Sequence, residues 1–225
     1  MLALKLGLSL VSNRKLGSWL PTDETSVVAW YQNGEGITLN GTDVSQWADS
    51  ANSYDMDQTD EVTEQPAYNA STGALTFDSS GKENLQTSSQ ISLAGDFTIG
   101  IRLYPTDFEK TFLGDNTENN YLFKYTTTSN LRFKVGGTAG NIALDSGTFG
   151  DDYLVITRDS DVITLHKNGV AQSTTVTKSG TAELDAIGIR NPDVNSYDGE
   201  IFEIQIFSST SSDLTANVNT YLSKL

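Results

Sequence analysis

The chain has 225 residues, of which 37% are hydrophobic, and its 29 Asp and Glu against 14 Lys and Arg give a formal net charge of −15. A field of that sign repels nucleic acid and anionic membrane surfaces, because both need a basic footprint on the protein, so neither is expected as a partner. The absence of cysteine excludes disulfides, thiol chemistry and cysteine-ligated zinc.

The first ten residues carry leucine at every second position. These residues are Leu2, Leu4, Leu6, Leu8 and Leu10. A period of two predicts an extended strand with one apolar face. Lys5 and Gly7 interrupt the apolar stretch, so we expect neither a signal peptide nor a membrane span. Two arrangements stay open: the strand packs within its own domain, or it is an assembly arm that adds to the sheet of a neighbour.

The body of the fold is expected over residues 26–225, and the arm with its linker over residues 1–25. Residues 27–31 form a dense apolar run typical of a buried strand, and a turn at Asn40–Gly41 precedes a strand at 44–47. Trp30 and Trp47 fall in these apolar segments and are expected in the core. Residues 49–64 are polar and acidic, which indicates a loop.

Further strands recur along the chain with turn signals between them. Residues 97–103 alternate in polarity, and residues 121–125 and 131–135 flank a polar connection typical of a hairpin. Asn168–Gly169 suits a two-residue type I′ turn, because both positions favour positive φ. The remaining strands are expected at 74–77, 153–158, 162–167, 170–177, 184–189 and 199–207. About twelve short strands at this spacing predict an all-β, antiparallel two-sheet sandwich.

The C-terminal segment has a helical period. Leu214, Val218, Tyr221, Leu222 and Leu225 follow the i, i+4, i+7, i+8, i+11 pattern of a short amphipathic helix. Ser212 is the expected N-cap, and Asp213 is favourable in the first turn.

Six motifs in order resemble those of concanavalin A-like and laminin-G-like jelly-roll domains. They lie at residues 47–52, 75–78, 96–99, 156–169, 198–204 and 221–222. The resemblance implies a concanavalin A-like jelly roll over residues 26–225. The opening segment also resembles the start of laminin-G-like virion structural proteins of marine bacteriophages, which implies a place in a virus particle.

Members of this family include glycoside hydrolases, lectins and structural modules, and the fold alone does not choose among them. A retaining glycosidase needs two carboxyl groups about 5–5.5 Å apart. The nearest candidates are Asp198, Glu200 and Glu203. Strict alternation puts Glu200 and Glu203 on opposite faces of one strand unless a bulge intervenes. We therefore expect no catalytic residues and no enzyme activity.

His166 is the only histidine. Its strand alternates Ile163 and Leu165 against Thr164 and His166, so we expect the imidazole on the surface or in a concave groove. A Ser–His–Asp arrangement cannot be argued from the sequence.

Calcium is the one metal ion that the sequence suggests, through hard oxygen ligands in loops. The weak candidate ligands are Asp55, Asp57 and Asp60 in one loop, and Asp193, Asn195 and Asp198 in another. A solvated acidic loop is the favoured interpretation of each set. No cofactor is expected to be required, and calcium binding is left open.

Sugar binding needs an exposed aromatic ring beside amide or acid groups. Trp19 in the linker and Tyr197 in a loop are the candidates for glycan contact, and a partner protein would use them equally well.

Together these features predict a non-catalytic virion structural protein, a capsid decoration or a tail or appendage subunit at the particle surface. It would occur in several copies and contact other virion proteins through the even-numbered leucines. The alternative is an extracellular carbohydrate-binding lectin module that recognises host surface glycans.

Overall fold

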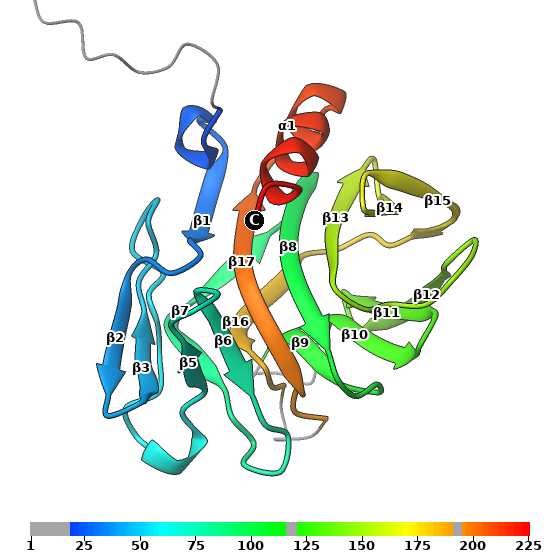
Figure 1. Ribbon diagram of the computed structural model, residues 1–225. Helices are drawn as coiled ribbons and strands as arrows, with labels where there is room; N and C mark the ends of the chain where they lie inside the picture. The colour runs from blue at the N-terminus through cyan, green and yellow to red at the C-terminus, as the bar shows by residue number, and fades with distance from the viewer. Residues whose placement is uncertain (1–18, 116–120, 191–194) are drawn as a thin grey trace, which may run out of the picture.

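The computed structural model describes residues 19–115, 121–190 and 195–225, so the leucine-rich segment lies outside the described residues. The described chain is almost entirely β-structure, with one C-terminal α-helix (Figure 1). Its 17 strands are hydrogen-bonded into one continuous sheet that folds over as two layers. The expected all-β jelly-roll sandwich is confirmed.

The first layer faces the viewer in Figure 1 and is built around β17. It contains β1 (Val27–Tyr31), β6 (Ala74–Phe77), β17 (Gly199–Phe207), β8 (Phe97–Pro105), β13 (Asp152–Asp159), β14 (Val162–Lys167) and β15 (Val170–Thr177). One edge of β17 pairs with β8, and its other edge is shared by β1 and β6. The order beyond β8 is β13, β14 and β15, all antiparallel.

The second layer closes the sandwich from behind. It contains β4 (Met56–Asp57), β7 (Leu85–Leu93), β16 (Ala182–Ile187), β9 (Thr111–Gly114), β10 (Tyr121–Thr127), β11 (Asn130–Val135) and β12 (Thr138–Ala143). The corner between the layers is formed by β2 (Ile37–Asn40), β3 (Asp43–Trp47) and β5 (Ala67–Asn69). Because β3 pairs with both β4 and β5, and β5 pairs with β6, the sheet runs without a break from one layer to the other.

The two layers enclose an apolar core that is rich in aromatic rings. Its large buried members are Tyr31, Trp47, Met56, Phe77, Phe97, Phe112, Phe123, Tyr125, Phe133 and Tyr197. The prediction that Trp30 and Trp47 are buried is confirmed. Burial of each large apolar side chain stabilises the fold by about 1.5–3 kcal/mol, so this cluster is the main source of stability.

The turn that follows β3 covers the free edge of β1. The carboxylate of Asp49 accepts a hydrogen bond from the backbone N–H of Trp30 (2.9 Å). The side-chain amide of Asn52 donates to the carbonyl oxygens of Val27 (3.2 Å) and Val28 (2.8 Å). Unpaired groups on an edge strand invite pairing with another chain. These two side chains occupy that edge instead.

Arg158 on β13 is buried and ties two connections to the sheet. Its guanidinium donates to the carbonyl oxygens of Leu93 (2.7 Å), Gly95 (2.8 Å) and Gly180 (2.7 Å). The guanidinium carbon also lies 4.8 Å from the centre of the Phe97 ring. The planar fork of five N–H donors suits this cluster of carbonyl acceptors.

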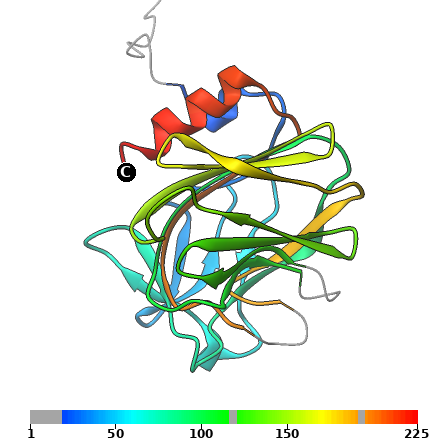
Figure 2. The ribbon, with the colours of Figure 1, turned by 90° about the vertical axis from the view of Figure 1, so that its right-hand side faces the viewer.

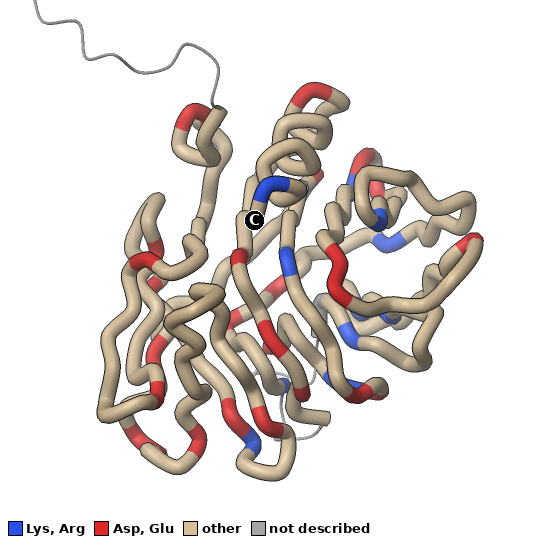
Figure 3. The backbone as a smooth tube through the Cα atoms, viewed as in Figure 1, with Lys and Arg blue, Asp and Glu red and all other residues tan. Residues whose placement is uncertain are grey.

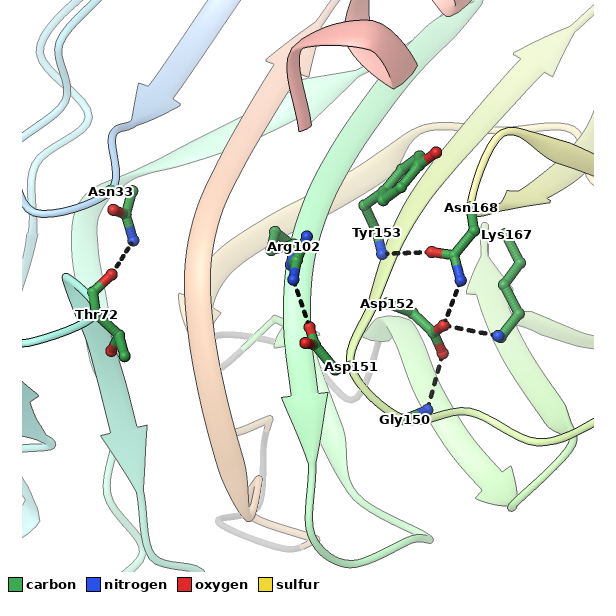
Figure 4. A network of polar contacts seen from close by, with 9 residues as sticks. All are labelled: Asn33, Thr72, Arg102, Gly150, Asp151, Asp152, Tyr153, Lys167 and Asn168. Carbon is green, nitrogen blue, oxygen red and sulfur yellow. Dashed lines mark hydrogen bonds and ion pairs between the residues drawn. The ribbon is translucent and has the colours of Figure 1, made fainter. Parts of the chain in front are cut away.

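The predicted turn at Asn168–Gly169 is confirmed, with both residues at positive φ (+50° and +80°) and Lys167 paired to Val170. Asp152 holds this turn against the start of β13, as Figure 4 shows. Its carboxylate accepts from Lys167 Nζ (2.6 Å) and Asn168 Nδ2 (2.7 Å).

Helix α1 (Ser212–Leu222) lies across the outer face of the first layer, against β8 and β13 (Figures 1 and 2). Its buried face consists of Leu214, Val218 and Leu222, as the periodicity predicts. Gly100 on β8 permits this close approach, because any side chain there would overlap Val218. The upper half of the outer face is thereby covered, and the lower half stays open.

The N-cap of α1 is Ser211, one residue before the predicted Ser212. Its Oγ accepts a hydrogen bond from the backbone N–H of Leu214 (3.1 Å), which satisfies one of the helix's free donors. Asp213 lies in the first turn as expected. Within the described ranges, no helix has the length and apolar character needed to cross a membrane.

Candidate functional site

Tyr197, a predicted glycan contact, is fully buried in the core. Its ring lies against Phe77 and Phe112, and its backbone N–H donates to the carbonyl of Gly188 (2.7 Å). The expectation of an exposed Tyr197 is wrong, because this hydrogen bond draws the end of the loop onto the core.

Trp19, the second candidate, is half-buried where the linker meets the body. Its Nε1 donates to Glu24 (2.8 Å), and its ring lies against Phe207 and Tyr221. Trp19 therefore joins the linker to α1 and β17 and presents only part of its ring to solvent. The even-numbered leucines of residues 2–10 lie outside the described residues, and their expected role in assembly stays a prediction.

His166 lines a groove of about 620 Å³ between β14 and α1, which also contains Thr164 and Asn219. Burial lowers the pKa of His166, so the imidazole is neutral at pH 7. Among the described side chains none forms a hydrogen bond with the ring, and no nucleophile–base pair is present there. Of the two positions left open for His166, the surface and a groove, the structure shows the groove.

The carboxylates of Asp55, Asp57 and Asp60 in the first acidic loop lie near one another but do not form a metal-binding cluster. Asp55 accepts from the backbone N–H of Asp49 (2.9 Å). Burial raises the pKa of Asp57, and the charges of Asp60 and Asp55 raise it further. Over residues 19–115, 121–190 and 195–225, no three or more acidic, histidine or cysteine side chains are grouped so as to hold a metal ion. Calcium binding stays a prediction.

The second acidic set is divided. Asp193 lies outside the described residues, while Asn195 has a positive φ of 57° in the adjoining loop. The carboxylate of Asp198 accepts hydrogen bonds from the Ser79 hydroxyl (3.0 Å) and from the Thr106 hydroxyl. Burial acts to raise the pKa of Asp198, but these hydrogen bonds, together with one from the backbone N–H of Ser79 and the charge of Lys110, outweigh it and lower the pKa. Asp198 thus holds two loops together.

A bulge at Phe202 changes the position of the acidic residues on β17. Glu200 lies opposite Tyr104 on β8, and Glu203 lies opposite Arg102, with the extra residue between them. Because positions 102 and 104 share a face, the two glutamates share it as well. The expectation of opposite faces is therefore wrong.

Glu203 is nevertheless closed to any ligand, because it is fully buried beneath the end of α1. Its Oε1 accepts from Trp30 Nε1 (2.7 Å) and Gln205 Nε2 (2.8 Å), and its Oε2 from the backbone N–H of Asn33 (3.1 Å). Burial raises the pKa of Glu203, and these hydrogen bonds together with one from Tyr221 counteract it. The carboxylate of Glu203 therefore joins β1, β17 and α1 through its hydrogen bonds.

An open cleft lies on the uncovered part of the same face. Thr76, Glu200 and Tyr104 are directly opposed on β6, β17 and β8, and opposed residues have Cβ atoms about 4.5–5.5 Å apart. Tyr104 is 43% exposed, one of the few large apolar side chains in the described chain with that much free surface. The cleft has a volume of about 580 Å³ and is lined by Thr76, Phe77, Asp78, Tyr104, Thr106, Asp198, Gly199 and Glu200.

Gly199 fixes the backbone at the edge of this cleft. Its φ is +135°, a conformation that favours glycine, and any side chain there would overlap the carbonyl oxygen of Tyr104. β17 and β8 therefore approach closely at this point, which keeps Tyr104 and Glu200 side by side.

Two carboxylates in the cleft have oxygens available to a ligand. One oxygen of Glu200 accepts from Asn69 Nδ2 (3.1 Å), and one oxygen of Asp78 accepts from the backbone N–H of Ser80 (2.7 Å). No donor in the described part of the chain reaches the other oxygen of either group. Beside the Tyr104 ring, this arrangement can hold a ligand that has a flat apolar face and hydroxyl donors at its edge.

The basic side chain nearest on β8 is already paired. Arg102 donates from Nη2 to Asp151 (2.7 Å), as Figure 4 shows, and its guanidinium carbon lies 5.6 Å from the centre of the Phe202 ring. Figure 3 shows acidic positions on the lower part of β17 and on the loops beside it, with few basic positions among them.

The pKa of Glu83, in the turn after β6, is affected by these acidic neighbours. Burial raises its pKa to about 7, and although a hydrogen bond from the backbone of Asp78 opposes the shift, the charges of Asp78, Asp43 and Asp198 add to it. The native state keeps a proton that the unfolded chain releases above a pKa near 4.5, so the free energy of unfolding falls as pH rises from about 5 to about 7.

We expect Glu83→Gln to match the wild type in stability at pH 5 and to exceed it by about 1 kcal/mol at pH 8, a figure already reduced for solvent screening of a half-buried group. Urea unfolding at the two pH values measures this difference. Glu183→Gln on β16 is the acid-to-amide control. Equal stabilities of Glu83→Gln and wild type at both pH values would contradict the shift.

Tyr104 is absent from the site residues expected from the sequence, although the sequence carries a signal for it. The alternation of residues 97–103 puts Arg102 on the outer face, and two residues further the same period exposes an aromatic ring. Extending the alternation to the end of the strand would have found it.

Comparison with known proteins gives a family and a set of structures. A family model described as the concanavalin A-like lectin/glucanases superfamily matches residues 77–215. No curated protein matches the chain in sequence.

Solved structures resemble the chain in fold at low sequence identity. Trypanosoma rangeli sialidase in complex with sialic acid matches with a TM-score of 0.55 and 10% identity over 89% of this chain, which spans only 33% of the sialidase chain. Domain 4 of AbnA, a GH43 extracellular arabinanase from Geobacillus stearothermophilus in complex with arabinotriose, matches with a TM-score of 0.56 and 12% identity over 87% of this chain and 97% of that domain.

A third match is botulinum neurotoxin type C, which depends on interaction with two ganglioside molecules to enter cells. Its TM-score is 0.54 and its identity 13%, over 88% of this chain and 51% of that chain. At such identities these likenesses show the fold alone.

Proposed function

The chain belongs to the concanavalin A-like lectin/glucanases superfamily, and from that premise we propose that it is a glycan-binding module that holds sugars without cleaving them. The observation that carries this proposal is the cleft in which the exposed ring of Tyr104 stands beside Glu200 and Asp78. An aromatic ring packs against the apolar face of a sugar, and carboxylate oxygens accept hydrogen bonds from its hydroxyls.

The similar structures support the proposal at the level of fold. A sialidase solved with sialic acid, an arabinanase domain solved with arabinotriose and a toxin that interacts with gangliosides all share this sandwich. Fold-level likeness does not carry a site from one protein to another. The cleft of this chain is therefore argued from its own residues.

The absence of cleavage is proposed from the two glutamates of β17. Glu200 is accessible, but Glu203 on the same face is fully buried and hydrogen-bonded by Trp30, Gln205 and Asn33. Most glycoside hydrolases use two carboxyl groups that both reach the scissile bond. Because Glu203 is buried, the two glutamates of β17 cannot form such a pair.

We expect Tyr104→Ala to weaken glycan binding at least about tenfold, because the variant removes the aromatic surface and leaves the carboxylates in place. The ligand is first found on a glycan array, and its affinity is then measured by isothermal titration calorimetry. The strand position of Tyr104 is half-exposed, so the variant is expected to keep the wild-type melting temperature within a few degrees.

Val170→Ala is the matched control, because Val170 is 64% exposed on β15 away from the cleft. It should bind like the wild type. Wild-type affinity in a folded Tyr104→Ala protein would overturn the proposed site, and silence of the wild-type protein across the array would overturn glycan binding altogether.

A place in a virus particle remains a separate proposal that rests on the sequence. The alternating leucines of residues 2–10 and the resemblance of the opening segment to phage structural proteins support it. Glycan binding and assembly are compatible in one chain, since the cleft lies on the sandwich and the arm precedes it.

A further inference from the structure

We infer that the cleft beside Tyr104 selects neutral glycans and rejects sialylated, uronate-containing or sulfated ones. This inference rests on the proposed function and adds the chemical class of the ligand. The similar sialidase and toxin structures involve acidic sugars and would suggest the opposite preference. The charges and hydrogen-bonding groups around the cleft of this chain favour neutral ligands instead.

The walls of the cleft are acidic on every side that carries a charge. Asp78, Asp198 and Glu200 line it. Glu83 lies close enough to Asp78 and Asp198 that their charges disfavour its ionised form. A ligand carboxylate or sulfate in this space is repelled by these negative charges.

The basic groups near the cleft do not offer a compensating contact. Arg102 is bound to Asp151 at 2.7 Å and its side chain is only 17% exposed. Lys110, in the connection after β8, pairs with Asp107 at 3.4 Å with 20% of its side chain exposed. Lys82 adds one cation to the turn after β6, where the acidic groups outnumber it. The charges of Arg102 and Lys110 are thus offset by Asp151 and Asp107, so the net charge around the cleft stays negative.

Hydrogen bonding gives the same preference. The available oxygens of Glu200 and Asp78 are acceptors, so they need donors from the ligand. Sugar hydroxyls supply donors. An ionised carboxylate or sulfate supplies acceptors alone, so it cannot form a hydrogen bond with the carboxylates of the cleft. Attraction for hydroxyls and repulsion of anions therefore act together, as a selective site requires.

Matched pairs of ligands test this selectivity. The wild-type protein is titrated with lactose and 3′-sialyllactose, and arrayed with neutral oligosaccharides of arabinose, glucose and galactose beside their sialylated, uronate or sulfated counterparts. At 0.15 M salt we expect the neutral member of each bound pair to bind at least about tenfold more tightly, and the difference to shrink as added salt screens the charges.

Charge-neutral variants test the cause. Asp78→Asn and Glu200→Gln keep an acceptor oxygen and remove the charge, so the double variant should narrow the difference between neutral and acidic ligands several-fold. Asp213→Asn on α1 removes a charge outside the cleft and should leave the difference unchanged. An unchanged preference in the folded double variant would overturn the electrostatic cause.

Two outcomes separate this inference from the function on which it rests. Tighter binding of acidic glycans that is lost in Tyr104→Ala would overturn the selectivity and leave glycan binding in place. Absence of binding to every neutral and acidic glycan would overturn the proposed function and the inference with it.

Discussion

Replacing Arg158 by alanine is expected to lower the free energy of unfolding by about 3–4 kcal/mol, because hydrogen bonds from a charged donor are worth about 1.5–3 kcal/mol each. The guanidinium donates hydrogen bonds to the carbonyls of Leu93, Gly95 and Gly180, which belong to two separate connections. The change leaves the buried Leu93 carbonyl without its side-chain donor, whereas the exposed glycine carbonyls can turn to water. Urea unfolding followed by tryptophan fluorescence measures the loss.

Two control variants separate packing from hydrogen bonding at this position. Arg158→Met keeps an apolar stem beside Phe97 and loses the guanidinium, so it should recover no more than about 1 kcal/mol of the loss. Arg132→Ala removes a partly exposed arginine on β11, whose one hydrogen-bond partner among the described residues is Asn141, and should change stability by less than about 0.5 kcal/mol. Stability of Arg158→Met within 1 kcal/mol of the wild type would contradict a structural role for the guanidinium.

Glu203→Ala is expected to destabilise the protein by about 4 kcal/mol. The carboxylate is the acceptor for Trp30 Nε1, for Gln205 Nε2 and for the backbone N–H of Asn33, all at the meeting point of β1, β17 and α1. Buried donors left without an acceptor cost about 1–3 kcal/mol each, and the shorter side chain also leaves a void. Thermal unfolding should show a lower melting temperature.

Glu203→Gln tests whether acceptors or charge matter at this point. The amide replaces one acceptor oxygen by a donor but also removes a buried charge that burial disfavours, so a smaller loss of about 1–2 kcal/mol is expected. Glu200→Ala is the matched control on the same strand and face, where the side chain is accessible, and should cost less than about 1 kcal/mol. Equal losses for Glu200→Ala and Glu203→Ala would contradict the distinction between an accessible and a structural carboxylate.

The sequence predicted strands well wherever one face is apolar and the period is clean. β6, β14, β15 and β17 have the bounds that alternation and the Asn168–Gly169 turn indicate. β7 (Leu85–Leu93) was missed, because Ser88 and Ser89 are exposed in its middle and make the segment resemble a loop. Its pairing with β16 is irregular at the same place, so no simple period marks it.

The bulge on β17 could not be predicted from the alternation of apolar and polar residues. Ile201, Ile204 and Ile206 all face the core, with a spacing of three and then two. Phe202 conceals the break in period, because an apolar residue in that place fits a continuous buried strand equally well. The face on which Glu203 lies depends on this one extra residue.

The site could be predicted only in part. The exposure of Tyr104 could be predicted, because it follows from the alternation of β8. Tyr197 was not, because loop position says little about burial when one hydrogen bond to Gly188 draws the ring inward. The cleft itself depends on the pairing of β6, β17 and β8, strands far apart in the sequence, and local patterns carry no information on that pairing.

The residues that carry the family resemblance serve the fold. Asp49 and Asn52 cover an edge strand, Arg158 and Asp198 hold loops, and Glu203 joins α1 to the sheet. Motifs of this kind mark a scaffold, and the proposed cleft is lined in part by motif residues, among them Asp78 and Glu200. The available oxygens of the cleft belong to residues that these structural hydrogen bonds leave accessible.

A single titration followed by nuclear magnetic resonance tests the central claim most directly, with the isotope-labelled chain and the best neutral oligosaccharide from the array. We predict saturable shifts of amide signals at residues 76–78, 104, 106 and 198–200, with the anomeric signals of the sugar unchanged over a day. Shifts confined to the groove beside His166, or new anomeric signals from shorter products, would contradict a non-catalytic glycan site at Tyr104.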